Sequence, residues 1–165
     1  MTLKNIILAP AVLAKLYKYS LVELKANEKK PVPPGADITF LGGNNKHILL
    51  LVNNVDAAFL PGDDLTFLSG ILSACKLSMQ DIAIVNLHKS KASNYKNVPG
   101  ILKAEIIIVS GVELSILELP FKIPLFQLQQ YKMKKYVAVP SLNTIQHDMD
   151  AKKKLWEILK VLFAV

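Results

Sequence analysis

Residues 47–89 read HILLLVNNVDAAFLPGDDLTFLSGILSACKLSMQDIAIVNLHK, and this stretch decides the fold class. It contains two short, almost purely apolar runs, His47–Val52 and Ile82–Leu87, which are typical of strands buried on both faces. Between them, Pro61 is expected to open a helix with apolar residues along one face: Leu65, Leu68, Ile71, Leu72 and Cys75. A strand, a helix and a second strand in this order predict two parallel strands joined by a crossover helix.

The same alternation continues toward the C-terminus. Apolar segments at 106–109, 121–125 and 136–139 are expected to form three more strands, and residues 112–117 a short helix. The last helix is expected to begin near Asp148 or Asp150 and to direct four apolar side chains inward: Leu155, Trp156, Leu159 and Leu162. Because nearly every strand is apolar throughout, we predict an α/β fold, a three-layer αβα sandwich with a mainly parallel central sheet.

The N-terminal part of the chain has a different pattern. Residues 1–30 are expected to form an amphipathic arm, with lysines between apolar side chains at helical spacing: Leu13, Leu16, Tyr17 and Leu21. A proline-rich linker is expected at 31–37, followed by a single α/β domain at 38–165. The arm must bury its apolar stripe, either in a groove of a partner or on its own domain. The pattern leaves both open.

The charge of the chain points to an acidic partner. The net charge is +7, from 20 basic and 13 acidic residues, and every basic residue is a lysine. Lysine contacts phosphate as a point charge and lacks the two-pronged geometry with which arginine reads bases. Any contact with DNA is therefore expected to be weak, salt-sensitive and independent of sequence. The alternative is a lysine-rich surface that is only solvated.

The composition disfavours several functional classes. Although 52% of the residues are hydrophobic, no uncharged apolar run is long enough to cross a bilayer, so we expect a cytoplasmic protein with no membrane contact. The single cysteine, Cys75, lies among apolar residues and is expected to be a buried free thiol. One cysteine and three scattered histidines suggest no metal site, and no phosphate-binding glycine motif is present. We therefore expect no metal, no cofactor and no small-molecule substrate.

In open α/β sheets the functional crevice lies beyond the carboxyl ends of the strands. No carboxylate directly follows a strand here, and Asp56 is the nearest one. His88 lies in a lysine-rich loop, where it is more simply a loop residue than a catalytic base. Ser110 and Ser141 also follow expected strands, but neither lies in a GxSxG motif. Asn53 and Asn54 most simply end a strand and form a turn. We predict a crevice without catalytic residues, lined by Asn53, Asn54, Asn86, His88, Pro140, Ser141 and Asn143.

The order of the segments resembles the uracil-DNA glycosylase superfamily. The run LLLVNN (49–54), a loop with Pro61 and the segment 67–89 are similar to its first strand, loop, helix and second strand. Residues 103–111 (KAEIIIVSG) and 152–159 (KKKLWEIL) are similar to its next strand and its closing helix. The resemblance implies a uracil-DNA-glycosylase-like fold.

At the reactive positions the chain departs from that superfamily. Asn53 and Asn54 stand where its iron–sulfur-type members have a glycine and a water-activating acid, and Val139 stands where they have a histidine that stabilises the departing base. The cysteines of the cluster are also missing. An apolar valine cannot stabilise the charge that develops during glycosidic cleavage. A divergent glycosylase, in which Asn54 positions a water, is kept as an alternative.

Three longer stretches resemble the psi subunit of bacterial DNA polymerase III, a non-catalytic relative on the same fold. They are LAKLYKYSLVELK (13–25), HILLLVNNVDAAFLPGDDLTFLSGIL (47–72) and VAVPSLNTIQHDMDAKKKLW (137–156). The resemblance implies an adaptor in the clamp-loader complex, whose arm docks on the clamp loader and whose folded body holds the chi subunit. A DNA-binding protein without sequence preference is the second alternative.

Overall fold

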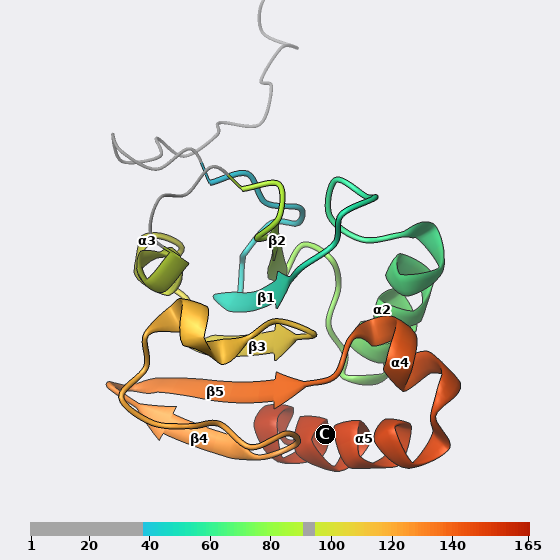
Figure 1. The fold of residues 1–165 in the computed structure, drawn as a ribbon. Coiled ribbons are helices and arrows are strands. Elements are labelled where there is room, and N and C mark those ends of the chain that lie inside the picture. Colours follow the sequence, from blue (N-terminus) through green and yellow to red (C-terminus); the bar gives the residue numbers. More distant parts are fainter. Residues whose placement is uncertain (1–37, 91–94) are drawn as a thin grey trace, which may run out of the picture. The chain divides into compact units, whose positions relative to one another are not determined.

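The computed structural model describes residues 38–90 and 95–165. The expected arm at 1–30 and linker at 31–37 lie outside the described residues. Strands and helices alternate along the described part (Figure 1). In chain order the elements are β1 (Ile48–Val52), α2 (Gly62–Ala74), β2 (Ile82–Asn86), the 3-10 helix η1 (Tyr95–Asn97), α3 (Val98–Ile101), β3 (Ile106–Ser110), the 3-10 helix η2 (Leu114–Leu117), β4 (Leu128–Tyr131), β5 (Lys134–Val139), α4 (Leu142–His147) and α5 (Met149–Phe163).

Five strands form one mixed sheet in the order β2-β1-β3-β5-β4. The first four are parallel, and β4 runs antiparallel to β5. Val52 of β1 lies opposite both Asn86 of β2 and Ser110 of β3, and Ser110 lies opposite Val139 of β5. The carboxyl ends of the parallel strands are therefore level, at the edge toward which the arrowheads of β1, β3 and β5 point in Figure 1.

The two faces of the sheet belong to separate cores, because successive residues of a strand point to opposite faces. Ile48, Leu50 and Val52 of β1 pack with α2, α4 and α5, whereas Leu49 and Leu51 pack with α3 and η2. All five side chains are at most 3% exposed. The chain is thus an α/β protein with helices on both faces of a mostly parallel sheet, consistent with the predicted three-layer sandwich.

The outer edge of β2 is covered by the segment that precedes β1. Leu41 exchanges two backbone hydrogen bonds with Ile84, at 2.9 and 2.8 Å, and the amides of residues 43–46 donate to the carbonyls just before and at the start of β2. Gly42 allows this close approach: its φ is 111°, and a Cβ there would lie 2.2 Å from the carbonyl oxygen of Ile82. The segment thereby pairs with β2 where a further strand would otherwise add.

The predicted strand at 121–125 is wrong. Its pairing is limited to an isolated bridge between Leu125 and Ala138. Pro120 and Pro124 flank and interrupt the segment, and proline cannot donate a hydrogen bond to a ladder. Phe121 and Ile123 pack into the core on one face of the sheet instead, and Leu125 is exposed.

Strand β4 was not predicted. Its sequence, LQQY, is mostly polar, and it is joined to β5 by Lys132 and Met133, which have φ values of 47° and 64°. Hairpin turns with two positive φ angles usually carry asparagine or glycine, so this turn has no recognisable sequence signal. Strand β5 also begins two residues earlier than expected, at Lys134.

Helix α5 begins where predicted, because Asp148 caps it: its Oδ1 accepts two backbone amides of the first turn, at 2.9 and 3.2 Å. Three of the four side chains predicted to face inward are buried: Leu155, Leu159 and Leu162. The prediction for Trp156 is wrong, since this side chain is 38% exposed. Successive helical residues are about 100° apart, so the side chain next to Leu155 leaves the buried stripe.

The other helices agree with the sequence in part. The apolar face of α2 packs on the sheet as predicted. The short helix expected at 112–117 is present as the 3-10 helix η2. Helices α3 and α4 were not predicted, since α3 has the sequence VPGI and α4 is six residues long. Such short segments carry too little periodicity to be recognised.

Candidate functional site

Asn86, the last residue of β2, joins the loops that follow β1 and β2. Its side chain is 2% exposed. Its Nδ2 donates to the carbonyls of Asn54, Ala57 and Ala58, at 2.8, 3.0 and 3.2 Å. Its Oδ1 accepts the amides of Asn54 and His88, at 3.0 and 3.1 Å. An asparagine side chain has two donors and two acceptor lone pairs, so its hydrogen-bonding capacity is fully used.

Asn54 forms the turn expected after β1. Its Oδ1 accepts the backbone amides of Asp56 and Ala57, at 2.9 and 2.7 Å. Asn53 before it is exposed. The two predicted crevice residues that follow β1 thus differ: one organises the loop through its side chain, and the other faces solvent.

The loops after β3 and β5 are in direct contact with each other. The hydroxyl of Ser110 donates to the carbonyl of Pro140 at 3.0 Å. Gly111 has a φ of 61°, and a Cβ at this position would lie 2.9 Å from the Cβ of Ser141. Ser141 in turn caps α4, since its Oγ accepts the amide of Thr144 at 3.2 Å.

The predicted crevice residues therefore belong to two groups. Asn54 and Asn86 belong to the loops after β1 and β2, and Pro140 and Ser141 belong to the loop after β5. Three further predicted residues have exposed side chains outside both sets of hydrogen bonds: Asn53, His88 and Asn143. The register places the two groups at the same edge of the sheet, but within the described residues no hydrogen bond links one group to the other.

A cavity of about 400 Å³ lies next to the first group. Of the predicted crevice residues, only Asn86 lines this cavity. Its wall carries the opposite charges of Asp56 and Lys89. The lining residues are Thr39, Asp56, Ala58, Phe59, Asn86, Lys89 and Ser90.

A buried carboxyl group at the same edge was missed by the sequence analysis. Asp64, in the first turn of α2, is 6% exposed, and its Oδ1 has no hydrogen-bond partner among the described residues. Burial raises the pKa of Asp64 above its ordinary value of 3.8, Asp63 adds to the rise, and His147 of α4 opposes it. From the sequence, two aspartates at the start of a helix predict only that their negative charges stabilise the positive N-terminal end of the helix dipole. The packing that buries one of them involves α4, which was not predicted.

Cys75 follows α2 and is a buried free thiol, as predicted. It is 3% exposed, and burial raises its pKa above 9.0. Within residues 38–90 and 95–165, no group of three or more His, Cys, Asp or Glu side chains is placed to share a metal ion. None of the helices in this part of the chain has both the length and the apolar character needed to cross a membrane.

Comparison with known proteins assigns no family. No protein-family model matches the chain, and a search of curated proteins finds no match to it. The fold and the side-chain geometry are therefore the basis for a functional assignment.

Proposed function

We propose that the chain is a cytoplasmic, non-catalytic protein-interaction subunit, resembling the psi subunit of the bacterial DNA polymerase III clamp-loader complex, on a uracil-DNA-glycosylase-like fold. The observation that carries the proposal is the engagement of the polar groups at the carboxyl edge. Asn86 uses its full hydrogen-bonding capacity on the backbone, and Asn54 accepts two backbone amides. To accept a hydrogen bond from a substrate or a water, the side-chain oxygen of either residue must first give up bonds that hold its own loop, and this costs free energy.

The residue at position 139 supports the same proposal. In the resemblance to the glycosylase superfamily, Val139 takes the place of the histidine that stabilises the departing base. Its side chain is 3% exposed and packs in the core between the sheet and helices α2, α4 and α5. A buried aliphatic group offers neither a proton nor a charge to a leaving group.

The order of the elements supports the proposed fold. β1, a loop with Pro61, α2 and β2 follow one another as in the superfamily segments that the sequence resembles. β3, β5 and the closing helix α5 come next, in the same order. The chain also contains the antiparallel strand β4, which corresponds to none of the segments that resemble the superfamily.

In this proposal the arm at 1–30 binds the clamp loader and the folded body binds a chi-like protein. The test is size-exclusion chromatography of the purified full chain with the clamp-loader complex and the chi protein of the same organism. The parent chain is expected to co-elute with both. Leu16→Asp combined with Leu21→Asp is expected to lose the clamp loader and keep chi, because it places charge in the apolar stripe. The control, Lys15→Gln with Lys18→Gln, changes polar positions of the same segment and is expected to bind both.

Two results contradict the proposal. If the parent chain binds neither the clamp loader nor chi, the assignment of partners is wrong. If it releases uracil from single- or double-stranded DNA and Asn54→Ala abolishes that release, the chain is an enzyme.

A further inference from the structure

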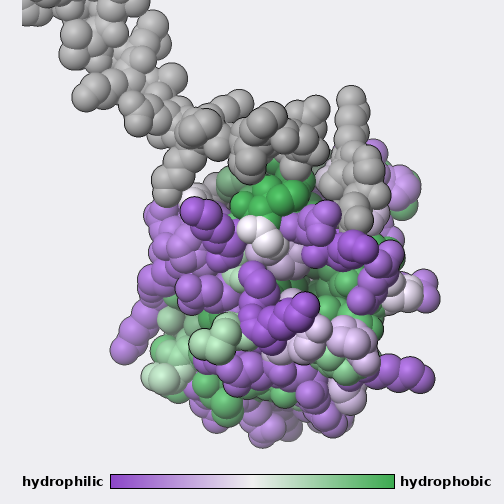
Figure 2. Space-filling view, turned by 90° about the vertical axis from the view of Figure 1, so that its left-hand side faces the viewer, coloured by the Kyte–Doolittle hydropathy of each residue, from purple (hydrophilic) through white to green (hydrophobic). Residues whose placement is uncertain are grey.

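The amino edge of the sheet, opposite the crevice, concentrates positive charge. Five lysines lie at or just before the starts of β1, β3 and β5: Lys46, Lys103, Lys132, Lys134 and Lys135. Two acidic residues, Asp81 and Glu105, lie just before β2 and β3, which leaves an excess of three positive charges at this edge. Backbone hydrogen bonds link these strand starts: the amide of Lys46 donates to Asp81 at 3.0 Å, that of Glu105 to His47 at 2.8 Å, and that of Lys135 to Glu105 at 2.8 Å. Figure 2 looks onto this edge and shows hydrophilic residues gathered across it.

The carboxyl edge has the opposite balance of charge. In the segments that directly follow the parallel strands or begin α2 and α5, two lysines, Lys89 and Lys152, are accompanied by six acidic residues: Asp56, Asp63, Asp64, Glu113, Asp148 and Asp150. A polyanion is attracted to a surface of positive potential and repelled by one of negative potential. The amino edge is therefore the place for the acidic partner that the net charge of +7 indicates.

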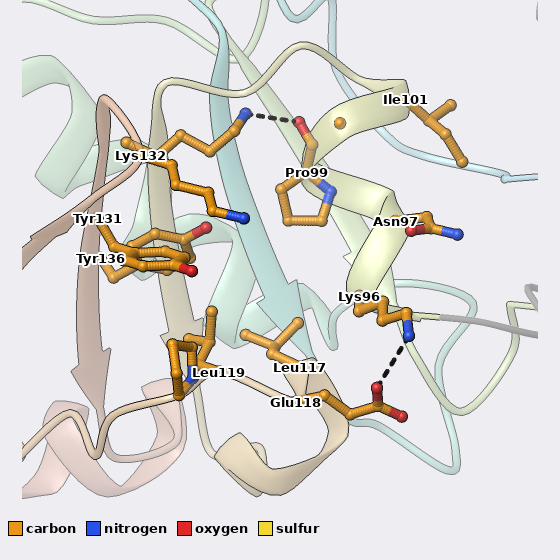
Figure 3. A pocket seen from close by; sticks show the side chains of 13 residues that line it. Lys96, Asn97, Pro99, Ile101, Leu117, Glu118, Leu119, Tyr131, Lys132 and Tyr136 are labelled. Atoms are coloured by element: carbon orange, nitrogen blue, oxygen red, sulfur yellow. Dashed lines mark hydrogen bonds and ion pairs between the residues drawn. The ribbon is translucent and has the colours of Figure 1, made fainter.

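A cavity of about 590 Å³ lies beside these lysines, between α3, the segment around η2 and the β4–β5 hairpin (Figure 3). This volume is in the range of small-ligand sites, about 300 to 1,000 Å³. Lys132 extends its ammonium group into the space between the two tyrosines of the hairpin and Pro99 on the opposite wall. Apolar and aromatic side chains form much of the lining: Pro99, Leu117, Leu119, Tyr131 and Tyr136.

The charges of two lysines at this cavity are not neutralised by a carboxylate among the described residues. The Nζ of Lys132 lies 5.2 Å from the centroid of the Tyr131 ring. The Nζ of Lys134 donates to the carbonyls of Pro99 and Ala104. The ion pair of the described part, Lys96 with Glu118 at 3.0 Å, involves neither lysine. A ring and neutral carbonyls position an ammonium group without cancelling its charge, so the cavity joins positive charge to an aromatic wall.

We propose that the amino edge binds single-stranded nucleic acid, with lysines contacting phosphates and one unpaired base entering the cavity against Tyr131. Both components of the site are needed for this ligand: the row of lysines matches a repeating phosphate charge, and an aromatic ring next to it offers a stacking surface for a base. An acidic protein segment uses the lysines alone, and a duplex has no free base for the cavity. This site is independent of the proposed adaptor role.

The lysines are tested by fluorescence anisotropy of a labelled oligothymidylate with the full chain at several salt concentrations. Lys46→Gln with Lys132→Gln is expected to raise Kd about tenfold and to reduce the slope of log affinity against log salt by about 1.4, or about 0.7 for each lost phosphate contact on a single strand. The control, Lys89→Gln with Lys153→Gln, removes the same charge from exposed positions away from the amino edge and is expected to leave Kd nearly unchanged.

The cavity is tested by changing its ring. Tyr131→Leu keeps an apolar side chain but removes the stacking surface, and it is expected to raise Kd about tenfold. Tyr131→Phe keeps the ring and is expected to bind like the parent chain. A thermal melt followed by circular dichroism checks that the leucine variant is folded.

Competition experiments separate this ligand from others. Duplex DNA and polyglutamate are expected to displace the labelled strand only at much higher concentration. Thymidine monophosphate is expected not to displace it when its concentration equals that of the nucleotides in the strand. Each of the following overturns the proposal: equal competition by any of them, equal weakening by the control lysine pair, or no effect of Tyr131→Leu in a folded protein. Equal competition by polyglutamate would instead assign the edge to an acidic protein.

Discussion

The side chain of Asn86 and the backbone of Asn54 bind each other in both directions. Nδ2 of Asn86 donates to the carbonyl of Asn54 at 2.8 Å, and Oδ1 of Asn86 accepts the amide of Asn54 at 3.0 Å. The two residues are 32 positions apart in sequence, so this pair fixes the loop after β1 to the end of β2. A single buried side chain thereby determines the path of the chain at the carboxyl edge.

Asn86→Ala is expected to lower the free energy of unfolding by about 3 kcal/mol, because it leaves several backbone donors and acceptors without partners in a buried setting. Urea denaturation measures the change. Asn143→Ala is the matched control: it truncates an exposed asparagine at the same edge and is expected to change stability by less than about 0.5 kcal/mol. Equal losses in the two variants would show that Asn86 does not hold the loops.

Two glycines are expected to respond to alanine in opposite directions. Gly42→Ala is expected to destabilise the protein by at least about 2 kcal/mol, because φ is 111° and the new Cβ meets a backbone oxygen. Gly70 lies inside α2, and a Cβ at this position would have no neighbouring atom within 4 Å, so Gly70→Ala is expected to stabilise by about 0.5 to 1 kcal/mol. Thermal melting of both variants checks the signs, and a stabilising Gly42→Ala would contradict the close pairing of 41–46 with β2.

Asp64 is expected to make stability depend on pH. Since burial raises the pKa of this carboxyl above 3.8, the folded chain binds its proton more tightly than the unfolded chain does. The stability that protonation contributes is present below about pH 3.8 and is lost as the pH rises through the raised pKa. Asp64→Asn removes this loss, so its free energy of unfolding relative to the parent is expected to improve from acidic to neutral pH. Urea titrations across this range measure it, and the opposite trend would mean that the native state favours the carboxylate.

Substitutions of Leu159 and Trp156 on α5 are expected to lower the free energy of unfolding by different amounts. Leu159 is 4% exposed, and Leu159→Ala is expected to cost about 3 kcal/mol through the cavity it leaves. Trp156 is 38% exposed, and Trp156→Ala is expected to cost less than half as much, although it removes a larger side chain. Both are measured by urea denaturation. A larger loss at Trp156 would restore the inward orientation predicted from the sequence.

The central part of the fold could be predicted from the sequence, because strands that are buried on both faces are apolar at nearly every position. Strands β1 and β2 are buried on both faces, and their apolar runs show it. The edge hairpin shows no apolar run: β4 is mostly polar, and its turn at Lys132 and Met133 uses residues that rarely adopt positive φ. The strand predicted at 121–125 does not form, because Pro124 within the segment and Pro120 just before it cannot donate to a ladder.

The candidate sites show the same division. The sequence places Asn54 and Asn86 at one edge of the sheet because both lie at the carboxyl ends of parallel strands, and the register supports that placement. Their mutual hydrogen bonds depend on the path of the loop 53–60, for which the sequence contains no signal. The lysines at 132–135 were visible as a cluster, but their proximity to Lys46 follows only from the strand order β1-β3-β5.

The covering of β2 by residues 41–46 also limits how copies of this sheet can join. Among the described residues, the outer border of β4 has no partner strand, whereas the border of β2 is already occupied. Two molecules that met border to border along β4 would form a continuous ten-stranded sheet whose two outer strands are both β2, each already paired with residues 41–46. Among the described residues, the addition of a further strand is therefore open along β4 and blocked at β2.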